Sequence, residues 1–471
     1  MACAVTVRTL EWVRDALENA GELVRAHLPA GATASPWSGA AIDTRSECAG
    51  RLFFALPGEN TDGHRFAVAA FRAGCSAVIV SDESVAAELD NAGAPYVLVR
   101  DTRRALQELA RGYRRHLGAR VVAITGSGGK TTTKEYVRAV LRTKFRTHAN
   151  PGNFNSQIGV PVTVLEADEH CEYLVCEVGA NRIGEIDFLG DLLRPDVAVI
   201  TNIGDAHVGY FGSRDAIATE KGAILAHLSS SGRALLPRDD EYFGKLSAIV
   251  QGRHSSFGRS PAADFRLANV TFGNGLLSFT VNGEPVSLSA VGDYNAMNAC
   301  AAFAVGDICG VEAARQREAF LSVRPTPGRG KIHVLAGVTI IDESYNASPT
   351  SMRKSLGMLA GLSAGRRVAV LGDMKELGDS SAAAHRGIGE EIVRLGLDRA
   401  YWLGDEGKVV RAGATSQKKG AAVDTFADVA GLVSAVAADA RDGDVILVKA
   451  SRACKLDEFV TGLVDALTAR N

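Results

Sequence analysis

The sequence lacks the cysteine patterns that mark a disulfide framework or a zinc site. Its eight cysteines form no CxxC pair and show no zinc-type spacing with histidine. They are Cys3, Cys48, Cys75, Cys171, Cys176, Cys300, Cys309 and Cys454. Reduced thiols in the cores of a cytosolic protein are therefore expected.

Long apolar runs and an excess of one charge are also missing. No stretch approaches the ~20 uninterrupted apolar residues of a membrane span. Near the N-terminus, Arg8, Glu11, Arg14 and Asp15 interrupt the place where a signal peptide needs its apolar segment. The formal net charge is −2, so no basic face indicates nucleic acid or an anionic membrane surface as a partner. The sequence predicts a cytoplasmic protein that neither binds nucleic acid nor inserts into a membrane.

The sequence does have the length and the glycine content of a multidomain α/β protein. At ~150 residues per domain, 471 residues predict about three domains. Hydrophobic residues at 46% and charged residues at 23% are ordinary for a chain that buries cores. The 50 glycines gather at the ends of apparent strands, which suits many tight strand-to-helix turns.

The pattern along the chain divides it further. Short strands mix with helical patches in the first hundred residues, and residues 101–121 have the periodicity of a connecting helix. From Val121 strands and helices alternate, as in a mostly parallel sheet, until hairpin patterns appear in residues 264–291. The Pro- and Gly-rich segment 324–330 predicts a second linker, followed by three α/β units. These features predict domains at residues 1–100, 101–325 and 326–471.

The segment TGSGGKTTT, residues 125–133, predicts a phosphate-binding loop. The strict P-loop pattern fails, because Ile124 stands where a glycine is required six places before the lysine. The remaining residues still have the features that bind phosphate. The glycines let backbone N–H groups converge on phosphate, and the following helix adds positive potential at its N-terminus. Lys130 can reach the outer phosphates, and the Thr131 hydroxyl can bind Mg²⁺. A plain glycine-rich turn is the alternative, but an ATP site is favoured.

Two later strand ends carry chemistry-bearing residues. Glu177 ends an apolar run, and its carboxylate fits a Mg²⁺ ligand. His207 lies just past another strand, where a hydrogen-bonded structural role is the alternative. Lys221, within a helical pattern, would by itself be a solvated lysine. Ligands of open α/β sheets gather at this edge, so Glu177 and His207 are candidates for one site.

The order of several motifs carries a family resemblance. The sequence contains TGSGGKTTT, NFNSQIGVP, EVGANRIGEI, TNIGDAHVGYFGS, EKGAI, YNAMNACAA, DESYNASPTSM, LGDMKELG and VKASR in the order of the Mur ligases. It is most similar to the members that add D-alanyl-D-alanine to UDP-MurNAc-tripeptide. The N-terminal segment IDTRSECAGRLFFALPGENTDGH resembles their uridine-nucleotide domain. The resemblance spans about residues 40–457.

This resemblance implies an α/β protein of three domains. They are a small N-terminal α/β domain for the UDP-sugar, a central P-loop-like ATPase domain with a mostly parallel sheet, and a C-terminal Rossmann-like domain that binds the incoming dipeptide. It also implies ATP and two Mg²⁺ ions as cofactors, small-molecule substrates as partners, a monomer, and a role in peptidoglycan synthesis.

The resemblance also assigns roles to residues. Lys130, Glu177, His207, Lys221 and Arg329 are implied as catalytic residues. Thr131, Glu177, His207 and Lys221 would surround the metals, the lysine as a carbamate that bridges two ions. The nucleotide would meet Gly126, Ser127, Gly128, Gly129, Lys130, Thr131, Thr132, Asn295, Asn298, Arg329 and Asp342. The other substrates would meet Thr44, Arg45, Asn60, Thr61, Asp62, Gly63, His64, Asn153, Asn155, Asn346 and Lys375.

The implied reaction needs alignment and charge neutralisation more than a protein nucleophile. A substrate carboxylate attacks the γ-phosphate of ATP to give an acyl phosphate. The amine of D-alanyl-D-alanine then attacks that carbonyl, and phosphate leaves. Closure of the third domain would exclude water from the acyl phosphate.

Three departures from the family pattern fall in the third domain: Ser348, Ala450 and Ala453. They bear on the fit of the dipeptide and leave the ATP chemistry intact. The alternatives are the Mur ligase that adds the third amino acid, although no DNPR-type motif is present, and an uncoupled P-loop ATPase or binding protein. Folylpolyglutamate synthase shares the ATP machinery, but the NTDGH segment argues against it.

Overall fold

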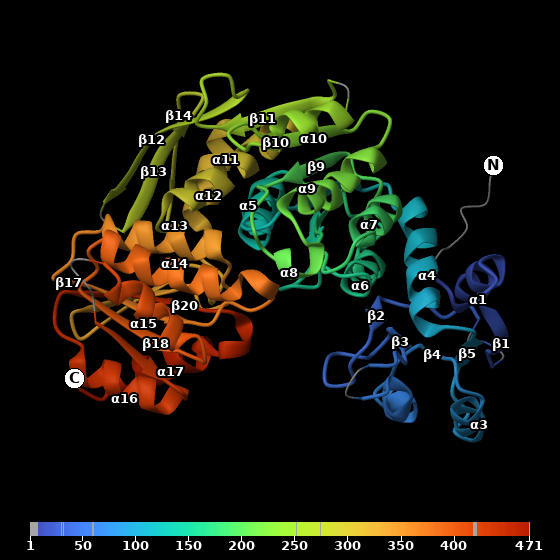
Figure 1. Ribbon diagram of the computed structural model, residues 1–471. Helices are drawn as coiled ribbons and strands as arrows, with labels where there is room; N and C mark the ends of the chain where they lie inside the picture. The colour runs from blue at the N-terminus through green and yellow to red at the C-terminus, as the bar shows by residue number, and fades with distance from the viewer. Residues whose placement is uncertain are drawn as a thin grey trace.

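The computed structural model describes residues 8–29, 31, 33–58, 61–250, 252–273, 275–417 and 422–470. They form three sheets, each flanked by helices, so the predicted α/β fold of three domains is confirmed (Figure 1). The sheets lie within the predicted ranges 1–100, 101–325 and 326–471, whose limits stay a prediction. Cys3 and the predicted substrate residue Asn60 lie outside the described residues.

The N-terminal sheet has the strand order β1-β5-β4-β3-β2 and is parallel except for β1 against β5. Its strands are β1 (Leu23–His27), β2 (Ala40–Ala41), β3 (Leu52–Phe54), β4 (Ala77–Val80) and β5 (Tyr96–Val99). Its helices are α1 (Leu10–Asn19), η1 (Gly63–Phe66), α2 (Ala67–Arg72) and α3 (Glu83–Asn91).

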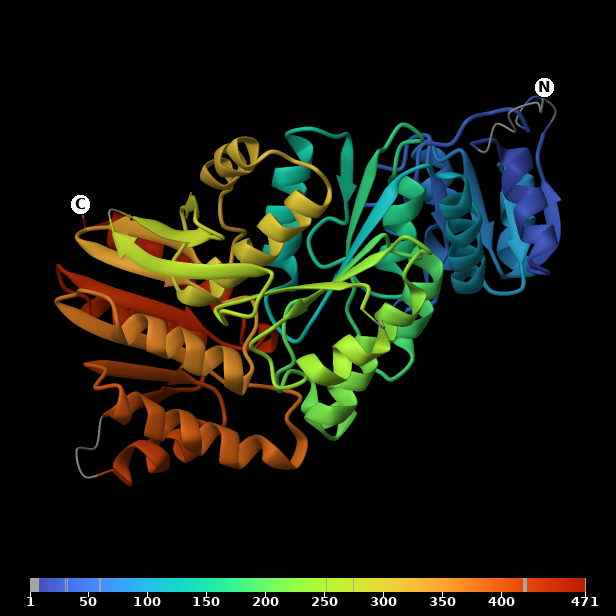
Figure 2. The ribbon, with the colours of Figure 1, turned by 90° about the horizontal axis from the view of Figure 1, so that it is seen from above.

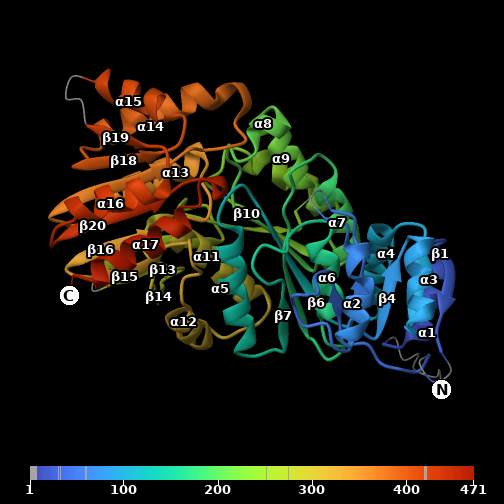
Figure 3. The same cartoon turned by 90° about the horizontal axis from the view of Figure 1, so that it is seen from below.

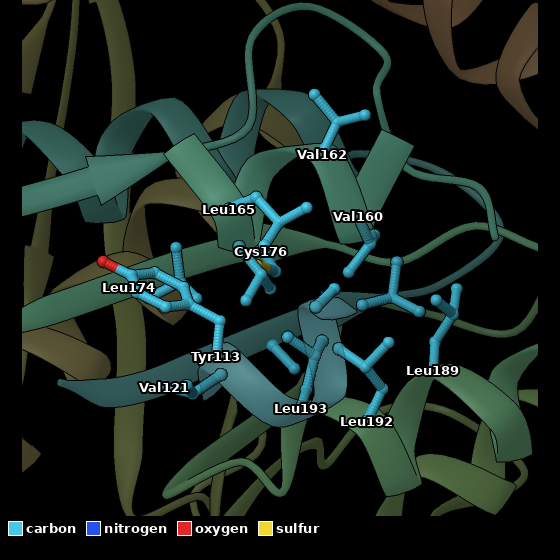
Figure 4. Packing of buried hydrophobic residues seen from close by; sticks show 14 of the residues in the cluster. Tyr113, Val121, Val160, Val162, Leu165, Leu174, Cys176, Leu189, Leu192 and Leu193 are labelled. Atoms are coloured by element: carbon cyan, nitrogen blue, oxygen red, sulfur yellow. The ribbon is translucent and has the colours of Figure 1, made fainter. Parts of the chain in front are cut away.

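Helix α4 (Thr102–His116) is the predicted connecting helix. It begins where the Asp101 carboxylate accepts hydrogen bonds from two amides of the first turn. Its apolar face joins one continuous core that runs from the N-terminal sheet to the central sheet. Figure 4 shows this core around Tyr113, with Val160 and Leu165 from α6 (Gly159–Glu166) and Leu174 from β8 (Tyr173–Glu177). The first domain is thereby packed firmly against the second.

The central sheet has the order β14-β13-β12-β11-β10-β9-β6-β8-β7. It is parallel from β7 to β12, and β12 to β14 are the predicted hairpins. Its strands are β6 (Arg120–Thr125), β7 (Thr147–Ala149), β8 (Tyr173–Glu177), β9 (Val197–Ile200), β10 (Arg233–Pro237), β11 (His254–Gly258), β12 (Phe265–Gly273), β13 (Leu276–Val281) and β14 (Glu284–Leu288).

The helices of this domain cover both faces of the sheet. They are α5 (Lys130–Arg142), α6 (Gly159–Glu166), α7 (Glu185–Leu193), α8 (Val208–Phe211), α9 (Arg214–Gly222), η2 (Ala223–His227), α10 (Phe243–Ile249), α11 (Asp293–Ile308) and α12 (Ala313–Ser322). The strands β6, β8 and β9 are buried along nearly their whole length, as expected of a sheet covered on both faces. Because these strands are parallel, the loops that follow them meet at one edge.

The third sheet has the order β15-β16-β20-β17-β18-β19, with β15 antiparallel to β16 and the other pairs parallel. Its strands are β15 (Lys331–Leu335), β16 (Val338–Asp342), β17 (Arg366–Gly372), β18 (Arg399–Leu403), β19 (Val423–Phe426) and β20 (Asp444–Lys449). Its helices are α13 (Pro349–Ala360), η3 (Gly378–Ser380), α14 (Ser381–Arg394), α15 (Gly407–Thr415), α16 (Val429–Asp439), η4 (Arg452–Cys454) and α17 (Leu456–Thr468).

The first and third domains lie on opposite sides of the central domain (Figure 2). Seen from below, α8 of the central domain faces the third domain (Figure 3), and it packs beside η3. None of the helices in the described ranges is long and apolar enough to cross a membrane. The central edge where the strand ends meet is thus placed between two domains that can bring substrates to it.

Candidate active site between the central and third domains

The predicted phosphate loop connects β6 to α5. Gly126 and Gly129 have φ angles of 146° and 78°, in the region that favours glycine. Space is equally limiting: a Cβ on Gly126 would lie 1.9 Å from Oγ1 of Thr201, and one on Gly129 would lie 2.3 Å from Oδ1 of Asn298. The glycines are therefore required by close contacts as well as by backbone shape.

The loop after β9 holds the phosphate loop in place. The Thr201 hydroxyl donates to the carbonyl of Gly128 at 2.6 Å, and the Asn202 side-chain amide both donates to that carbonyl and accepts from the Gly128 N–H. Oγ of Ser127 accepts from the Gly204 N–H at 2.8 Å. Thr201 and Asn202 were not predicted as site residues, although their position directly after a buried strand is a signal for such a role.

Lys130 is the first residue of α5, and its ammonium group contacts the phosphate loop that precedes the helix. Nζ donates to the carbonyl of Gly126 at 2.9 Å. Burial lowers the pKa of Lys130 below its ordinary value; Glu177 acts against this lowering, and the positive charge of Arg329 adds to it. These effects place Lys130 near a residue of the central sheet and near a residue of the linker to the third domain.

An oxygen-rich cluster lies beside the loop. The Thr131 hydroxyl donates to Oε2 of Glu177 at 2.5 Å, and the Asn155 amide donates to Oε1 of the same carboxylate at 2.7 Å. Glu177 is buried, and its backbone N–H donates to Asn150. A hydroxyl and a carboxylate are hard oxygen donors, and Mg²⁺ is commonly held by one or two carboxylates together with substrate phosphates. The donor set therefore fits Mg²⁺, although no group of three His, Cys, Asp or Glu side chains suited to a metal occurs in the described ranges.

Lys221 is buried within α9 and is not a solvated helix lysine. Its side chain is 1% exposed, and it makes no hydrogen bond or ion pair with any residue that the structure describes. Burial, and then the charge of Lys130, lower the pKa of Lys221 to about 7, against the opposing effect of Glu220. Glu220 is not a close counter-ion, since its carboxylate accepts from the N–H groups of Gly184 and Ile186 at the start of α7.

His207 lies at the N-terminus of α8 in a left-handed conformation, with φ of 63°. Its Nδ1 is 2.5 Å from Oε2 of Glu376 in the third domain, a distance of an ion pair without the alignment of a hydrogen bond. Burial lowers the pKa of His207; Glu376 opposes this, and the charges of Lys130 and Lys221 add to it. The charges of both lysines thus act on the pKa of His207, while the carboxylate closest to its ring belongs to Glu376 of the third domain.

A cavity of about 550 Å³ lies between the central and third domains. Asn298 lines it beside the phosphate loop, whereas Asn295 is not among the lining residues and its amide donates to the carbonyl of Val291. Its walls are mainly apolar, which suits the flat face of a purine. The lining residues include Thr201, Asn202, Phe272, Tyr294, Met297, Lys354, Met358 and Leu362, of which Lys354 and Met358 come from α13 and Leu362 follows that helix.

Arg329 lies in the linker, and Asp342 is the last residue of β16, the second strand after the linker. The Arg329 guanidinium stacks on the ring of Tyr345 with its carbon 4.0 Å from the ring centroid. The Asp342 carboxylate accepts from the N–H of Gly328 and from both the N–H and the hydroxyl of Ser344. Asp342 therefore fixes the shape of the linker, and a contact with ribose stays a prediction.

Of the predicted UDP-sugar residues that the structure describes, Thr44 and Arg45 lie in a turn between β2 and β3, and residues 61–64 lie at and just before the start of η1. Arg45 is 89% exposed and forms a bidentate pair with Asp43, holding the pKa of that carboxyl at about 2. His64 is buried: Nδ1 lies 2.7 Å from Oδ1 of Asp62, and Nε2 accepts from the Ser81 N–H at 2.9 Å. Both ring nitrogens of His64 are therefore engaged within the protein.

Thr44, Thr61 and Gly63 stay predictions as substrate contacts. The Gly63 position has no room for a side chain, because a Cβ there would lie 2.7 Å from the backbone N of Leu56. Asn153 is exposed in the loop after β7, next to Asn155. Thr132 lies in the first turn of α5.

The third-domain residues surround the turn after β17. The Lys375 ammonium pairs with Asp373 at 3.0 Å, which raises the pKa of the lysine. Asn346 is exposed, and its side chain accepts from the N–H of Ala347. Ser348 is the N-cap of α13 in a reciprocal capping pair with Ser351, so this departure from the family pattern has a structural reason.

The other two departures lie close by. Ala450 is buried against Gly372, where an added Cβ would lie 2.9 Å from the Ala450 Cβ. Ala453 is exposed in η4. Nothing in the structure explains why alanine stands at Ala453.

Gly126→Ala is expected to weaken nucleotide binding by at least about tenfold, because the new Cβ would displace the Thr201 hydroxyl from Gly128. Titration with a fluorescent ATP analogue measures the effect. Gly244→Ala is the matched control, since a Cβ there meets nothing within 4 Å on a helix of the same domain. Equal affinities for the two variants would contradict the proposed cradle.

Three family models match the chain. Residues 37–114 match the Mur ligase family catalytic domain, residues 124–306 the Mur ligase middle domain, and residues 328–452 the glutamate ligase domain of Mur ligases. The chain is 38% identical to the UDP-N-acetylmuramoyl-tripeptide--D-alanyl-D-alanine ligase of Bacillus subtilis over 432 residues, covering 91% of this chain and 93% of that one.

Solved structures agree with these matches. The crystal structure of MurF from Acinetobacter baumannii superposes with a TM-score of 0.81 at 31% identity, covering 90% of this chain and 93% of that one. MurF from Thermotoga maritima in complex with ADP gives a TM-score of 0.79 at 30% identity, covering 92% and 98%.

Proposed function

This chain belongs to the Mur ligase family, and we propose that it joins D-alanyl-D-alanine to UDP-N-acetylmuramoyl-tripeptide in an ATP-dependent reaction. The product is the UDP-MurNAc-pentapeptide precursor of peptidoglycan. The observation that carries the proposal is that the likeness to dipeptide ligases covers all three domains, including the third, which is proposed to receive the incoming amine. A shared ATPase domain alone would not distinguish the members of the family.

The nucleotide is proposed to bind across the phosphate loop, with its base in the cavity between the domains. Gly126 and Gly129 are proposed to offer backbone N–H groups to the phosphates, and α5 adds positive potential at its N-terminus. The N–H groups of Ser127 and Gly128 donate to Asn202, so these two residues are proposed to shape the loop around the phosphates. Asn298 stands between this loop and the cavity. The apolar side chains of Phe272, Met297 and Met358 would pack on the purine.

Mg²⁺ is proposed to be held by Thr131 and Glu177 together with phosphate oxygens. A bound magnesium ion neutralises phosphate charge and orients the γ-phosphate for attack. Asn155 holds the second oxygen of Glu177, so it orients the carboxylate in addition to its predicted place near the muramoyl group. His207 and Lys221 remain proposed metal residues. The lysine would serve as a carbamate.

The reaction proceeds through an acyl phosphate. A carboxylate oxygen of the tripeptide attacks the γ-phosphorus, and the bond to ADP breaks. The free amine of D-alanyl-D-alanine then attacks the acyl carbon, phosphate leaves with the bonding electron pair, and the amine loses a proton. Lys130 and Arg329 are proposed to neutralise the phosphoryl oxygens, since both are cations near the loop.

The UDP-sugar is proposed to bind the first domain through Thr44, Arg45 and residues 60–63. His64 fixes the shape of this loop through Asp62 and Ser81 and acts on the substrate only indirectly. In the third domain, Asn346 and Lys375 are proposed contacts of the dipeptide. We further propose that the enzyme is a monomer and works in the cytoplasm, where its nucleotide-linked substrates are made.

Phosphate release tests the function directly. With ATP, Mg²⁺ and UDP-MurNAc-tripeptide, release is expected to depend on D-alanyl-D-alanine and to yield a product whose mass is the sum of the two substrates less water. Release independent of both substrates would identify an uncoupled ATPase. Release supported by UDP-MurNAc-dipeptide and a free amino acid would identify the ligase that acts one step earlier.

A further inference from the structure

The loop of residues 201–207, between β9 and α8, touches two domains at once. On the side of the central domain, Thr201 and Asn202 form hydrogen bonds with Gly128, and Gly204 forms hydrogen bonds with Ser127. The loop is therefore bound to both inner residues of the phosphate loop. Any shift of the phosphate loop is passed to it through these hydrogen bonds.

On its other side, the same loop meets the first turn of α13 in the third domain. The Thr350 hydroxyl donates to Oδ2 of Asp205 at 2.6 Å. Gly204 lies between the two contacts, because a Cβ placed there would be 3.4 Å from Cβ of Ser127 and 3.8 Å from Oγ1 of Thr350. The Asp205 carboxylate also lies near the N-terminus of α13, where the helix dipole favours a negative charge.

Asp205 is itself held in place. Its other oxygen, Oδ1, lies 3.4 Å from the guanidinium of Arg214, which in turn donates to the carbonyl of Ile203. The acceptor that Thr350 meets is therefore fixed to the central domain.

A second contact between the domains lies a few residues further on. The Gly209 N–H donates to the carbonyl of Glu376 at 3.0 Å, and a Cβ on Gly209 would lie 2.6 Å from that oxygen. The linker side of the interface is held separately, by the hydrogen bond from Tyr294 to Glu343. The contacts of Asp205 and Gly209 thus belong to the edge that closes over the phosphate loop.

We propose that Thr350 and Asp205 are positioning residues that couple the phosphate loop to the docking of the third domain. Their hydrogen bond joins the dipeptide-binding domain to the loop that holds Gly128 and Ser127, so the acyl phosphate is kept for the amine and away from water. This inference rests on the proposed ligase function. Neither residue touches the reacting atoms.

Thr350→Val removes the hydroxyl, and Thr350→Ser keeps it as the matched control. With Thr350→Val, the KM for D-alanyl-D-alanine is expected to rise about tenfold, the expected loss for one hydrogen bond to a charged group, with a smaller change in kcat. Phosphate released per ligated product should rise from about one to two or more, because unprotected acyl phosphate hydrolyses. Thr350→Ser should restore both values.

Two results would overturn the proposal. One is a Thr350→Val enzyme whose phosphate-to-product ratio and dipeptide KM stay within about twofold of the parent. The other is an equal loss of activity in both Thr350 variants with an unchanged ratio, which indicates a purely structural role. Gly209→Ala offers an independent check, because it should raise the same ratio by obstructing the second contact.

Hydrogen exchange separates this inference from the ligase assignment. A non-hydrolysable ATP analogue with Mg²⁺ should slow exchange of amides 208–212 and 374–378 in the parent and in Thr350→Ser, but not in Thr350→Val. If the nucleotide slows exchange but the protein ligates no dipeptide, the proposed ligase function is contradicted and the proposed coupling between the domains is supported. Equal protection in all three proteins would refute the coupling, whatever the assay of ligation shows.

Discussion

Replacing Lys130 with alanine is expected to lower kcat/KM for the coupled reaction by roughly 10³-fold or more while the fold stays intact. The lysine is the first residue of α5, and its ammonium already lies within hydrogen-bonding distance of the loop carbonyl of Gly126. Burial lowers its pKa, so the charge is costly to keep unless an anion such as phosphate shares the site. Removing the lysine removes the charge that the γ-phosphate would meet.

The measurement is the steady-state rate of phosphate release with all substrates present, together with the thermal midpoint of each protein. Lys408→Ala is the control, because Lys408 is exposed on α15 and makes no hydrogen bond or ion pair with the described residues. Its activity and midpoint should match the parent. Substantial turnover in Lys130→Ala, with the midpoint unchanged, would withdraw the phosphate-cradle assignment for this loop.

Local patterns predicted the fold well because each rests on neighbours in the sequence. The β-branched run before Gly126, the connecting helix from Thr102 and the hairpins after Phe265 are all encoded within about twenty residues. The family resemblance then supplied the order of the domains. The glycine-rich loop and the strand ends lie at one edge of the central sheet as predicted, and the roles of their residues stay predictions.

Contacts between residues that lie far apart in the sequence could not be predicted from local patterns. Nothing near His207 in the sequence indicates that its ring faces Glu376, and nothing near Asp205 indicates Thr350. The buried state of Lys221 is equally a product of packing, since its own helix has a polar side. His64 shows the reverse case: its motif indicates a ligand site, while its ring nitrogens contact Asp62 in the same segment and Ser81 after β4.

Lys221→Ala is expected to be inactive and to regain partial activity with added acetate or chloride. The buried amine makes no hydrogen bond within the described ranges, and its pKa of about 7 leaves a large neutral fraction at neutral pH. Only the neutral amine adds CO₂: a C–N bond forms, one proton leaves, and the product is an anionic carbamate. A small anion can occupy the space that the truncated side chain vacates and replace the lost negative charge.

Lys134→Ala is the matched control, because Lys134 is also buried but donates to the carbonyls of Asn150 and Gly152. It should lose thermal stability, and anions should not rescue its activity. A ¹³C signal from labelled bicarbonate gives a readout besides activity: it should appear in the parent and be absent from Lys221→Ala. Full activity of Lys221→Ala without any anion would end the carbamate hypothesis.

The pH dependence of stability gives the same lysine a second test in CO₂-depleted buffer. The unfolded chain keeps its proton up to a pKa of 10.5, whereas the folded chain releases it near 7. Unfolding therefore takes up a proton between these values, and the stability of the folded state rises with pH across that window. Lys221→Met should raise the thermal midpoint most at or below pH 7, and the gain should shrink toward pH 9. An unchanged difference across this range would mean that the lysine stays charged in the folded protein, and a charged amine cannot take up CO₂.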